Sequence, residues 1–340
     1  MRKILNTLYV TNESAYLSVD GENIVVSVTG QKDFRLPLCN IEEVVCFNYM
    51  GCSPKLMGKC VENKISISFV TPNGKFLARI IGETKGNVFT RINQIDIIRD
   101  SICKLHLIQN SLAAKFVNTK FLLSRSLRDY PEINDDGQVG SIIEKINNAV
   151  KSIYNITDEN VLRGIEGDIA KDYFAIFGRL IRNNEFSFNG RSKRPPLDEI
   201  NAVLSLLYTL QANSITSALE TAGIDPYIGF FHTQRPGRAS LSLDILEEFR
   251  ATIDRFVISI FNLKQVNRKD FEKKAGGAVL LNNDGRHKVI KLWQEKKKEI
   301  IIQPFINEKI HLGLLPYMQA SLLGKYIRKE IAEYPPYINK

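Results

Sequence analysis

Short stretches in which apolar and polar residues alternate fill the first 84 positions of the chain. They predict β-strands, because β-branched residues recur within them and turn residues separate them. The turns are Asp20-Gly21 and Pro72-Asn73-Gly74, and the strands cover residues 4–11, 15–19, 23–28, 44–49, 65–70 and 75–81. Residues 53–62 indicate one short helix, with Ser53 as its N-cap and Pro54 at its first helical position. The pattern predicts a small, β-sandwich-like N-terminal domain over residues 1–84.

Beyond about residue 87 the apolar residues recur at the spacing of helix faces. The candidate helices cover residues 87–123, 140–153, 158–183, 197–221, 242–262 and 315–331. Residues 183–199, NNEFSFNGRSKRPPLDE, are polar, basic and interrupted by proline, so they predict a loop. We therefore predict an α+β fold, in which a larger all-α catalytic domain over residues 85–340 follows the β domain.

The composition narrows the class of protein. Hydrophobic residues make up 44% of the chain and charged residues 24%, as in ordinary globular proteins. We expect no membrane segment, because no apolar stretch reaches about 18 residues, and no signal peptide at the N-terminus. The five cysteines are odd in number and never in CxxC spacing, which argues against a disulfide framework and a zinc ribbon. A reducing, cytoplasmic location is expected.

Positive charge is concentrated in the second part of the chain. Residues 1–84 carry nine Lys and Arg against eight Asp and Glu, so nearly all of the net charge of +9 lies beyond them. A local basic excess favours a polyanionic partner such as nucleic acid, although many basic proteins bind none.

One of the four histidines stands in an apolar run within GFFHTQRPGRASLSLDILEEFR, residues 229–250. His232 is followed by Arg235 and Arg238, which flank a Pro-Gly turn and could present guanidinium groups to phosphate oxygens. The alternative is a histidine held in the core or in a turn, which is the commoner role of a lone histidine.

Three carboxylates follow in the same segment, at the spacing of one helix face: Asp244, Glu247 and Glu248. Acids near a helix N-terminus also favour the helix dipole and face water, so this cluster alone has a structural explanation. Glu166, in VLRGIEGDIAKDYF, lies at the edge of an apolar stripe between Gly164 and Gly167. Glycines there admit a close neighbour, which is either a ligand or a second helix.

Taken together, Glu166, His232 and a carboxylate of the 244–248 segment form a set of oxygen and imidazole donors. Such a set suits Mg²⁺ or Mn²⁺ and leaves positions open for water and phosphate. An ion of this kind polarises a phosphodiester and lowers the pKa of an attacking hydroxyl.

Four segments resemble a known family. They are LNTLYVTNESAYLSVDGENIVV, VLRGIEGDIAKDYF, RPPLDEINAVLSLLYTL and GIDPYIGFFHTQRPGRASLSLDILEEFR, which together span nearly the whole chain. They resemble the CRISPR-associated endonuclease/integrase family of the adaptation module (Cas-one), and the N-terminal opening is similar to the type I-C branch.

The resemblance implies a β domain followed by a helical domain, a homodimer built partly through the β domains, and a small second subunit (Cas-two). It implies an enzyme that joins the 3′-hydroxyl ends of captured DNA to a CRISPR array by strand transfer. The family's metal triad falls on Glu166, His232 and Glu247, with Asp244 as an accessory acid one turn earlier. Whether Asp244 or Glu247 is the third ligand, and whether His232 is a ligand or a proton acceptor, stays open.

Basic residues near these segments are the candidate DNA contacts: Arg191, Lys193, Arg194, Arg235 and Arg238. A second basic run, Lys296–Lys298 beside Trp293, more closely fits an exposed helix face. Two other classes of function compete with a nuclease or integrase. One is a non-catalytic nucleic-acid-binding helical protein, and the other is a helical scaffold whose polar residues are solvated or paired.

Overall fold

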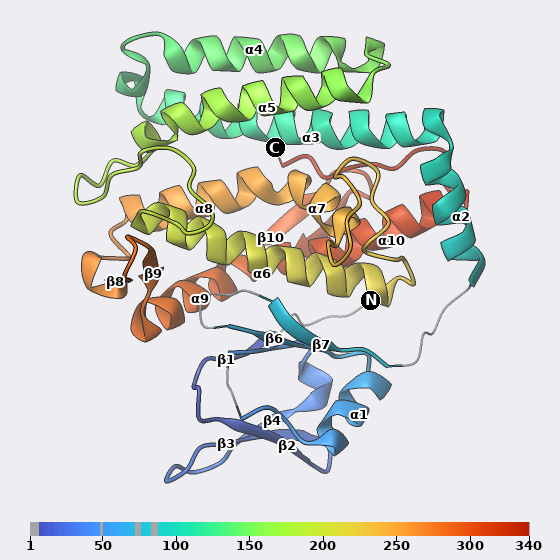
Figure 1. The fold of residues 1–340 in the computed structure, drawn as a ribbon, viewed down its shortest axis with the longest axis vertical. Coiled ribbons are helices and arrows are strands. Elements are labelled where there is room, and N and C mark those ends of the chain that lie inside the picture. Colours follow the sequence, from blue (N-terminus) through green and yellow to red (C-terminus); the bar gives the residue numbers. More distant parts are fainter. Residues whose placement is uncertain (1–6, 48–49, 72–75, 83–87, 340) are drawn as a thin grey trace.

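The computed structural model describes residues 7–47, 50–71, 76–82 and 88–339. A small region of two β-sheets lies below a larger helical region (Figure 1). The α+β fold predicted from the sequence is confirmed. Residues 4–6 and 48–49 of two predicted strands, the turn at residues 72–74 and the domain boundary at residue 84 lie outside the described residues.

The N-terminal region contains one four-stranded and one three-stranded sheet. The four-stranded sheet has the order β1-β5-β6-β7 and the three-stranded sheet the order β2-β3-β4. The strands are β1 (Thr7–Val10), β2 (Tyr16–Asp20), β3 (Asn23–Ser27), β4 (Phe34–Pro37), β5 (Glu43–Cys46), β6 (Ser66–Val70) and β7 (Phe76–Ile80). Strands β1, β5 and β6 are parallel, and β7 is antiparallel to β6. The short, mostly exposed β4 is not predicted from the sequence, because its four residues, FRLP, are too few to show a repeated pattern.

Helix α1 (Pro54–Glu62) completes this region. As predicted, Ser53 caps it, because its Oγ accepts the backbone N–H of Leu56 at 3.2 Å. Residues from both sheets and from α1 share one core, including Leu17, Val44 and Leu56, none of which is exposed. The region is therefore a small sandwich with one helix.

The helical region begins with two consecutive helices where the sequence predicts one over residues 87–123. Helix α2 (Val88–Arg99) ends before Asp100, whose carboxylate accepts the N–H groups of Ile102 and Cys103 and so starts α3 (Ser101–Asp129). The other helices are α4 (Gln138–Ser152), α5 (Glu159–Ile176), α6 (Glu199–Thr221), α7 (Ser240–Leu246), α8 (Arg250–Asn262), α9 (Asn283–Lys297) and α10 (Leu315–Ile327).

Two small hairpins also lie in this region. They pair β8 (Phe271–Lys273) with β9 (Val279–Leu281), and β10 (Ile300–Gln303) with β11 (Glu308–His311). Strands of three or four residues are too short to show an alternating pattern, so the sequence analysis does not separate them from loops.

Helices α3, α4 and α5 form the upper layer, and α6 lies below them and above the four-stranded sheet (Figure 1). Helix α6 is buried on most of its surface, which agrees with its largely apolar sequence. It joins the two regions, since Ser217 Oγ lies 3.0 Å from Ser66 Oγ and Glu220 pairs with Arg79 at 3.2 Å. Among the described residues no helix is both long and apolar enough to span a bilayer.

Candidate metal centre

The structure brings Glu166, His232 and Glu247 to one place in the helical region. Glu166 lies on α5, His232 in the loop between α6 and α7, and Glu247 in the single 3₁₀ turn (Glu247–Phe249) that separates α7 from α8. Lys115, on α3, lies among them. Residues from α3, α5 and the stretch 232–247 therefore meet at this site.

Asp244 fixes the loop that carries His232. Its buried carboxylate accepts the backbone N–H groups of Phe230 at 2.7 Å, Phe231 at 3.1 Å and His232 at 2.8 Å. His232 Nδ1 lies 2.7 Å from the same carboxylate. Gly229 makes room for this arrangement, because a Cβ there would stand 2.6 Å from Asp244 Oδ2. Nδ1 of His232 therefore faces the carboxylate, which leaves Nε2 for another partner.

His232 Nε2 lies 3.9 Å from Glu247 Oε1. An ion with bonds of about 2.1 Å could span this separation, so the two residues could share one. The second oxygen of Glu247, Oε2, lies 2.7 Å from Lys115 Nζ and 2.8 Å from Arg250 Nε.

The two glutamates contact the same cation. Lys115 Nζ makes a short contact with Glu166 Oε1 and also pairs with Glu247. As they stand, no three His, Cys, Asp or Glu side chains among the described residues form a ready metal-binding group. Lys115 and Arg250 pair with carboxylate oxygens that an ion would need. The donor types themselves, two carboxylates and one oriented imidazole, fit Mg²⁺ or Mn²⁺.

The charges around Glu247 keep it ionised. Burial alone would raise its pKa, but Arg250, Lys115 and His232 together lower that pKa to about 2. Glu247 is therefore an anion at neutral pH, as a metal ligand must be.

Glu248 has a different role from its neighbour. Its buried carboxylate accepts hydrogen bonds from Tyr334 Oη at 2.7 Å, Tyr337 N at 2.8 Å and Gln319 Nε2 at 3.0 Å. Burial raises its pKa to about 7. The three acids that the helical spacing places on one face thus point to three different partners: Asp244 to the histidine loop, Glu247 to Lys115 and Arg250, and Glu248 to the C-terminal segment.

Lys115 and Arg250 are site residues that the sequence analysis missed. Arg250 ends the segment quoted above, one helical turn after Glu247, and this spacing could have shown that it pairs with that glutamate. Lys115 lies in SLAAKFVNT on a helix with many buried residues, and a lysine among apolar neighbours was the available signal of a buried ion pair.

A basic cavity of about 450 Å³ lies beside this centre. Four of the five predicted DNA contacts line it: Arg191, Lys193, Arg194 and Arg238. Arg79 and Arg250 add to its positive charge. Arg235 is exposed and does not belong to the described lining.

The basic run at Lys296–Lys298 is engaged elsewhere. Lys297 is buried and donates to Thr7 Oγ1 at 3.0 Å, which ties α9 to strand β1. Lys296 pairs with Glu299 and Lys298 with Glu295 on the helix surface. The expectation of an exposed helix face therefore holds for Lys298 alone, because Lys296 is half-buried and Lys297 is buried.

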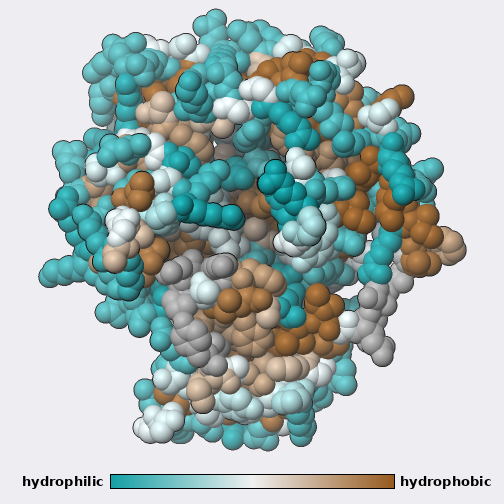
Figure 2. Space-filling model, in the orientation of Figure 1, coloured by the Kyte–Doolittle hydropathy of each residue, from teal (hydrophilic) through white to brown (hydrophobic). Residues whose placement is uncertain are grey.

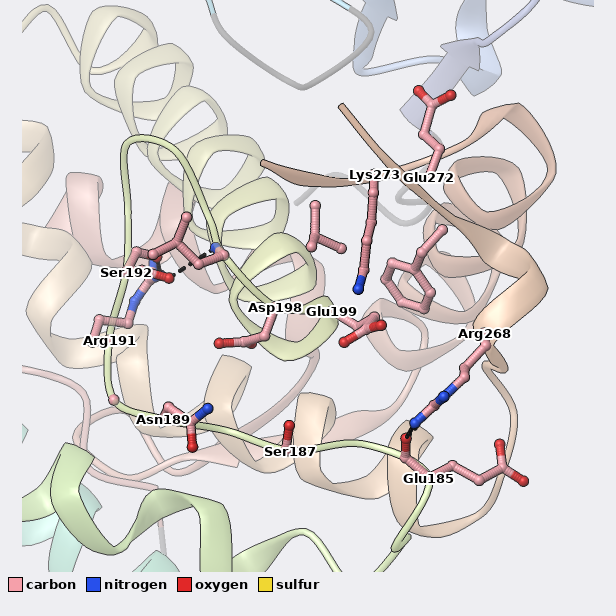
Figure 3. A pocket seen from close by; sticks show the side chains of 14 residues that line it. Glu185, Ser187, Asn189, Arg191, Ser192, Asp198, Glu199, Arg268, Glu272 and Lys273 are labelled. Carbon is pink, nitrogen blue, oxygen red and sulfur yellow. Dashed lines mark hydrogen bonds between the residues drawn. The ribbon is translucent and has the colours of Figure 1, made fainter. Parts of the chain in front are cut away.

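A second cavity, of about 630 Å³, lies between residues 185–199 and the β8–β9 hairpin (Figure 3). Acidic and basic residues both line it, among them Glu185, Glu272, Arg268 and Lys273. The described residues that line it include neither a histidine nor any of the three predicted metal ligands. It is therefore separate from the candidate centre.

Comparison with known proteins places the sequence of this chain in a family. The family model for CRISPR associated protein Cas1 matches residues 8–295. The chain is 41% identical over 341 residues to a CRISPR-associated endonuclease Cas1 of Chlorobaculum tepidum, covering 99% of each chain. It is 40% identical to a second one, from Rhodospirillum rubrum, over the full length of both.

Solved structures share the fold at lower identity. A casposase bound to an integration product superposes with a TM-score of 0.83 at 21% identity, covering 98% of this chain and 94% of that one. A Cas1 protein from Thermotoga maritima gives a TM-score of 0.78 at 19% identity, covering 95% and 97%. These comparisons do not assign a branch, so the type I-C resemblance stays a prediction. By sequence along nearly its full length, the chain belongs to the Cas1 family of CRISPR-associated endonucleases.

Proposed function

We propose that this protein is a Mg²⁺- or Mn²⁺-dependent DNA endonuclease and integrase of CRISPR adaptation. In this function it joins the 3′-hydroxyl ends of captured DNA to the CRISPR array. The observation that carries the proposal is that Lys115 Nζ contacts both Glu166 and Glu247, while His232 Nε2 lies 3.9 Å from Glu247 Oε1. Family membership supports the nuclease part of the proposal.

Glu166, Glu247 and His232 would hold the ion, and Asp244 would set the direction of the imidazole. A bound divalent ion polarises the scissile phosphodiester and lowers the pKa of the attacking hydroxyl. Asp244 is an unsuitable third ligand, because its oxygens already accept three backbone N–H groups and the imidazole. We favour His232 as a ligand rather than a proton acceptor, because its Nε2 faces a carboxylate of the same set.

The basic cavity would position the DNA. Nuclease and integrase both displace an oxygen in line at phosphorus and differ in whether water or a sugar hydroxyl attacks. Arginines and lysines that hold a DNA end in place favour the sugar hydroxyl, since correct positioning contributes several kcal/mol to the rate. Arg191 is fixed for such a role by a 2.6 Å hydrogen bond from its Nη1 to Asn201 Oδ1. Arg235, outside this lining, would contact DNA from the adjacent surface.

The proposed partners are DNA, the small subunit Cas-two and a second copy of the chain. Solved structures with this fold are described as a casposase bound to an integration product, a Cas6-RT-Cas1–Cas2 complex and a Cas1–DNA complex. One of these descriptions names DNA and another names Cas2, which supports the first two partners. All five cysteines are free thiols, which supports the proposed cytoplasmic location.

Apolar surface supports the homodimer. Exposed hydrophobic side chains gather on β7 and at the start of α2, including Leu77, Ile81, Phe89 and Ile92. Figure 2 shows this hydrophobic surface over α2 at the right of the view. Because β7 is the last strand in the order of its sheet, a second copy could cover both the strand edge and the apolar side chains.

The test combines the protein with Cas-two, Mn²⁺, a short DNA duplex and a labelled plasmid that carries a CRISPR array. We expect joined products with the wild type and none with His232→Ala or Glu247→Gln. Lys298→Ala, on the surface of α9, is the matched control and should join DNA normally. Nicking without joining would leave a nuclease only, and binding without either reaction would favour the non-catalytic alternative.

A further inference from the structure

A lysine side chain lies between the two carboxylates of the proposed metal centre. Lys115 Nζ contacts Glu166 Oε1 and lies 2.7 Å from Glu247 Oε2. The Lys115 side chain is 12% exposed and that of Glu247 is 4% exposed. A lysine is almost never buried to this degree unless anions pair with it. The two carboxylates therefore hold Lys115 in the centre of the site.

Another lysine on the same helix shows the difference from an ordinary ion pair. Lys104 Nζ lies 2.7 Å from Glu159 Oε1, so it also connects α3 with α5. Three helical turns separate Lys104 from Lys115, so both lie on the same face of α3. Lys104 is 26% exposed and pairs with one carboxylate, whereas Lys115 bridges carboxylates from two elements.

Two cations match the charges of the two glutamates. Glu166 and Glu247 supply two negative charges, and Lys115 and Arg250 supply two positive charges in contact with them. A divalent ion on the same carboxylates competes with the ammonium for oxygen atoms and adds two positive charges. Lysine has a compact charge on a flexible stem, so its ammonium is the group that can leave. A phosphate of bound DNA is an anion that can receive it.

We propose that Lys115 is a built-in counter-ion that competes with the divalent ion for Glu166 and Glu247. By this competition it couples ion loading to DNA binding. The inference rests on the function proposed above. In the DNA complex the ammonium moves from the carboxylates to a phosphate oxygen. The protein then binds the ion weakly until DNA is present, and by linkage the ion and DNA strengthen each other's binding by the same factor.

The experiment is a calorimetric titration of Mn²⁺ into the full chain, with and without a short duplex that ends in 3′-dideoxynucleotides. Such ends prevent strand transfer. Without DNA, Lys115→Gln should bind Mn²⁺ about fivefold or more tightly than the wild type, a factor within the usual range of coupling between sites. The gain in Mn²⁺ affinity on adding the duplex should be smaller in Lys115→Gln. Lys104→Gln, the matched control, should behave as the wild type does in both titrations.

Lys115→Arg keeps the positive charge and should bind Mn²⁺ no more tightly than the wild type. If Lys115→Gln does not fold, this variant carries the test, and tighter binding by it overturns the proposal. Equal or weaker Mn²⁺ binding by a folded Lys115→Gln also overturns it.

Glu247→Gln distinguishes a failure of the proposed metal centre from a failure of the counter-ion role alone. If Mn²⁺ binding to the wild type does not depend on Glu247, the metal centre itself is wrong. If binding depends on Glu247 but not on Lys115, the counter-ion role alone is wrong.

Discussion

The Nδ1 atom of His232 lies 2.7 Å from Oδ1 of Asp244, and the same carboxylate accepts three consecutive backbone N–H groups of the histidine loop. One buried side chain thus fixes both the backbone of the loop and the direction of the imidazole. Carboxylates that orient a ligating histidine in this way raise its basicity and set its tautomer.

Replacing Asp244 by Asn should weaken Mn²⁺ binding and DNA joining by about 10- to 100-fold, the usual cost of losing such a partner of a ligating histidine. The shape is nearly kept, but an amide has one acceptor oxygen where the carboxylate has two. The measurement is a Mn²⁺ titration alongside the joining assay. Asp225→Asn is the control, because Asp225 accepts the N–H of Tyr227 in the same connection but does not contact His232. A fully active Asp244→Asn protein would contradict this role.

The convergence of Glu166, His232 and Glu247 could be predicted, because family resemblance maps each residue onto a short motif. Whether Asp244 or Glu247 is the proposed third ligand could not be predicted, because three- and four-residue spacing puts both on one helix face. The structure separates them by a 3₁₀ turn at Glu247–Phe249 that nothing in the apolar periodicity of residues 242–262 indicates. The turn is packed against residues 334–337, almost 90 positions away, and local sequence does not report such contacts.

The length of an element decided whether it could be predicted. Long helices show many repeats of the apolar pattern, whereas β4 and the β8–β9 and β10–β11 hairpins have three or four residues each. The partner of Lys115 was also hidden. Its ion pairs join α3 to α5 and to the 3₁₀ turn, over 51 and 132 positions, and depend on tertiary packing alone.

Asp254 should make the stability of the protein depend on pH. Burial raises its pKa to about 6, although Tyr208 and Tyr173 donate hydrogen bonds to it. Its pKa in the unfolded chain is about 4, so the folded state binds the proton more tightly. This contribution to stability is fully present below about pH 4 and is lost as pH rises through about 6, by about 3 kcal/mol at most.

Asp254→Asn should remove this part of the pH dependence, because the amide does not titrate. Urea unfolding between pH 4 and 7, in the presence of a chelator, measures the free energy of unfolding. The difference in free energy of unfolding between the variant and the wild type should move in favour of the variant as pH rises from 4 to 7. Asp33→Asn, on the exposed loop between β3 and β4, should follow the wild type. Parallel curves for Asp254→Asn and the wild type would show that Asp254 is not the group responsible.

Arg238 should contact a DNA phosphate, because it lines the basic cavity beside the proposed centre. Arg238→Ala should weaken binding similarly for all sequences and reduce the slope of log affinity against log salt by about 1. Fluorescence anisotropy with a labelled duplex at several salt concentrations gives both quantities. Lys298→Ala removes an equal charge that is paired with Glu295 and should leave the slope unchanged. An unchanged slope for Arg238→Ala would exclude this arginine as a phosphate contact.

A second copy of the chain should cover the apolar surface of β7 and α2. Leu77 and Ile81 are 55% and 66% exposed, far more than apolar residues that pack within a monomer. In an isologous interface each side chain occurs twice, so one substitution changes two contacts.

Leu77→Asp with Ile81→Asp should therefore convert a dimer at micromolar concentration to a monomer, as measured by light scattering. The far-UV circular dichroism spectrum of the monomer should be unchanged, since both side chains are exposed on the isolated chain. Ile302→Asp places the same charge on β10, where the side chain is 56% exposed, and should remain dimeric. A dimeric double variant, or a monomeric wild type, would move the interface away from this surface. A monomer that still binds DNA but joins none would further indicate that the two DNA ends are held by two copies.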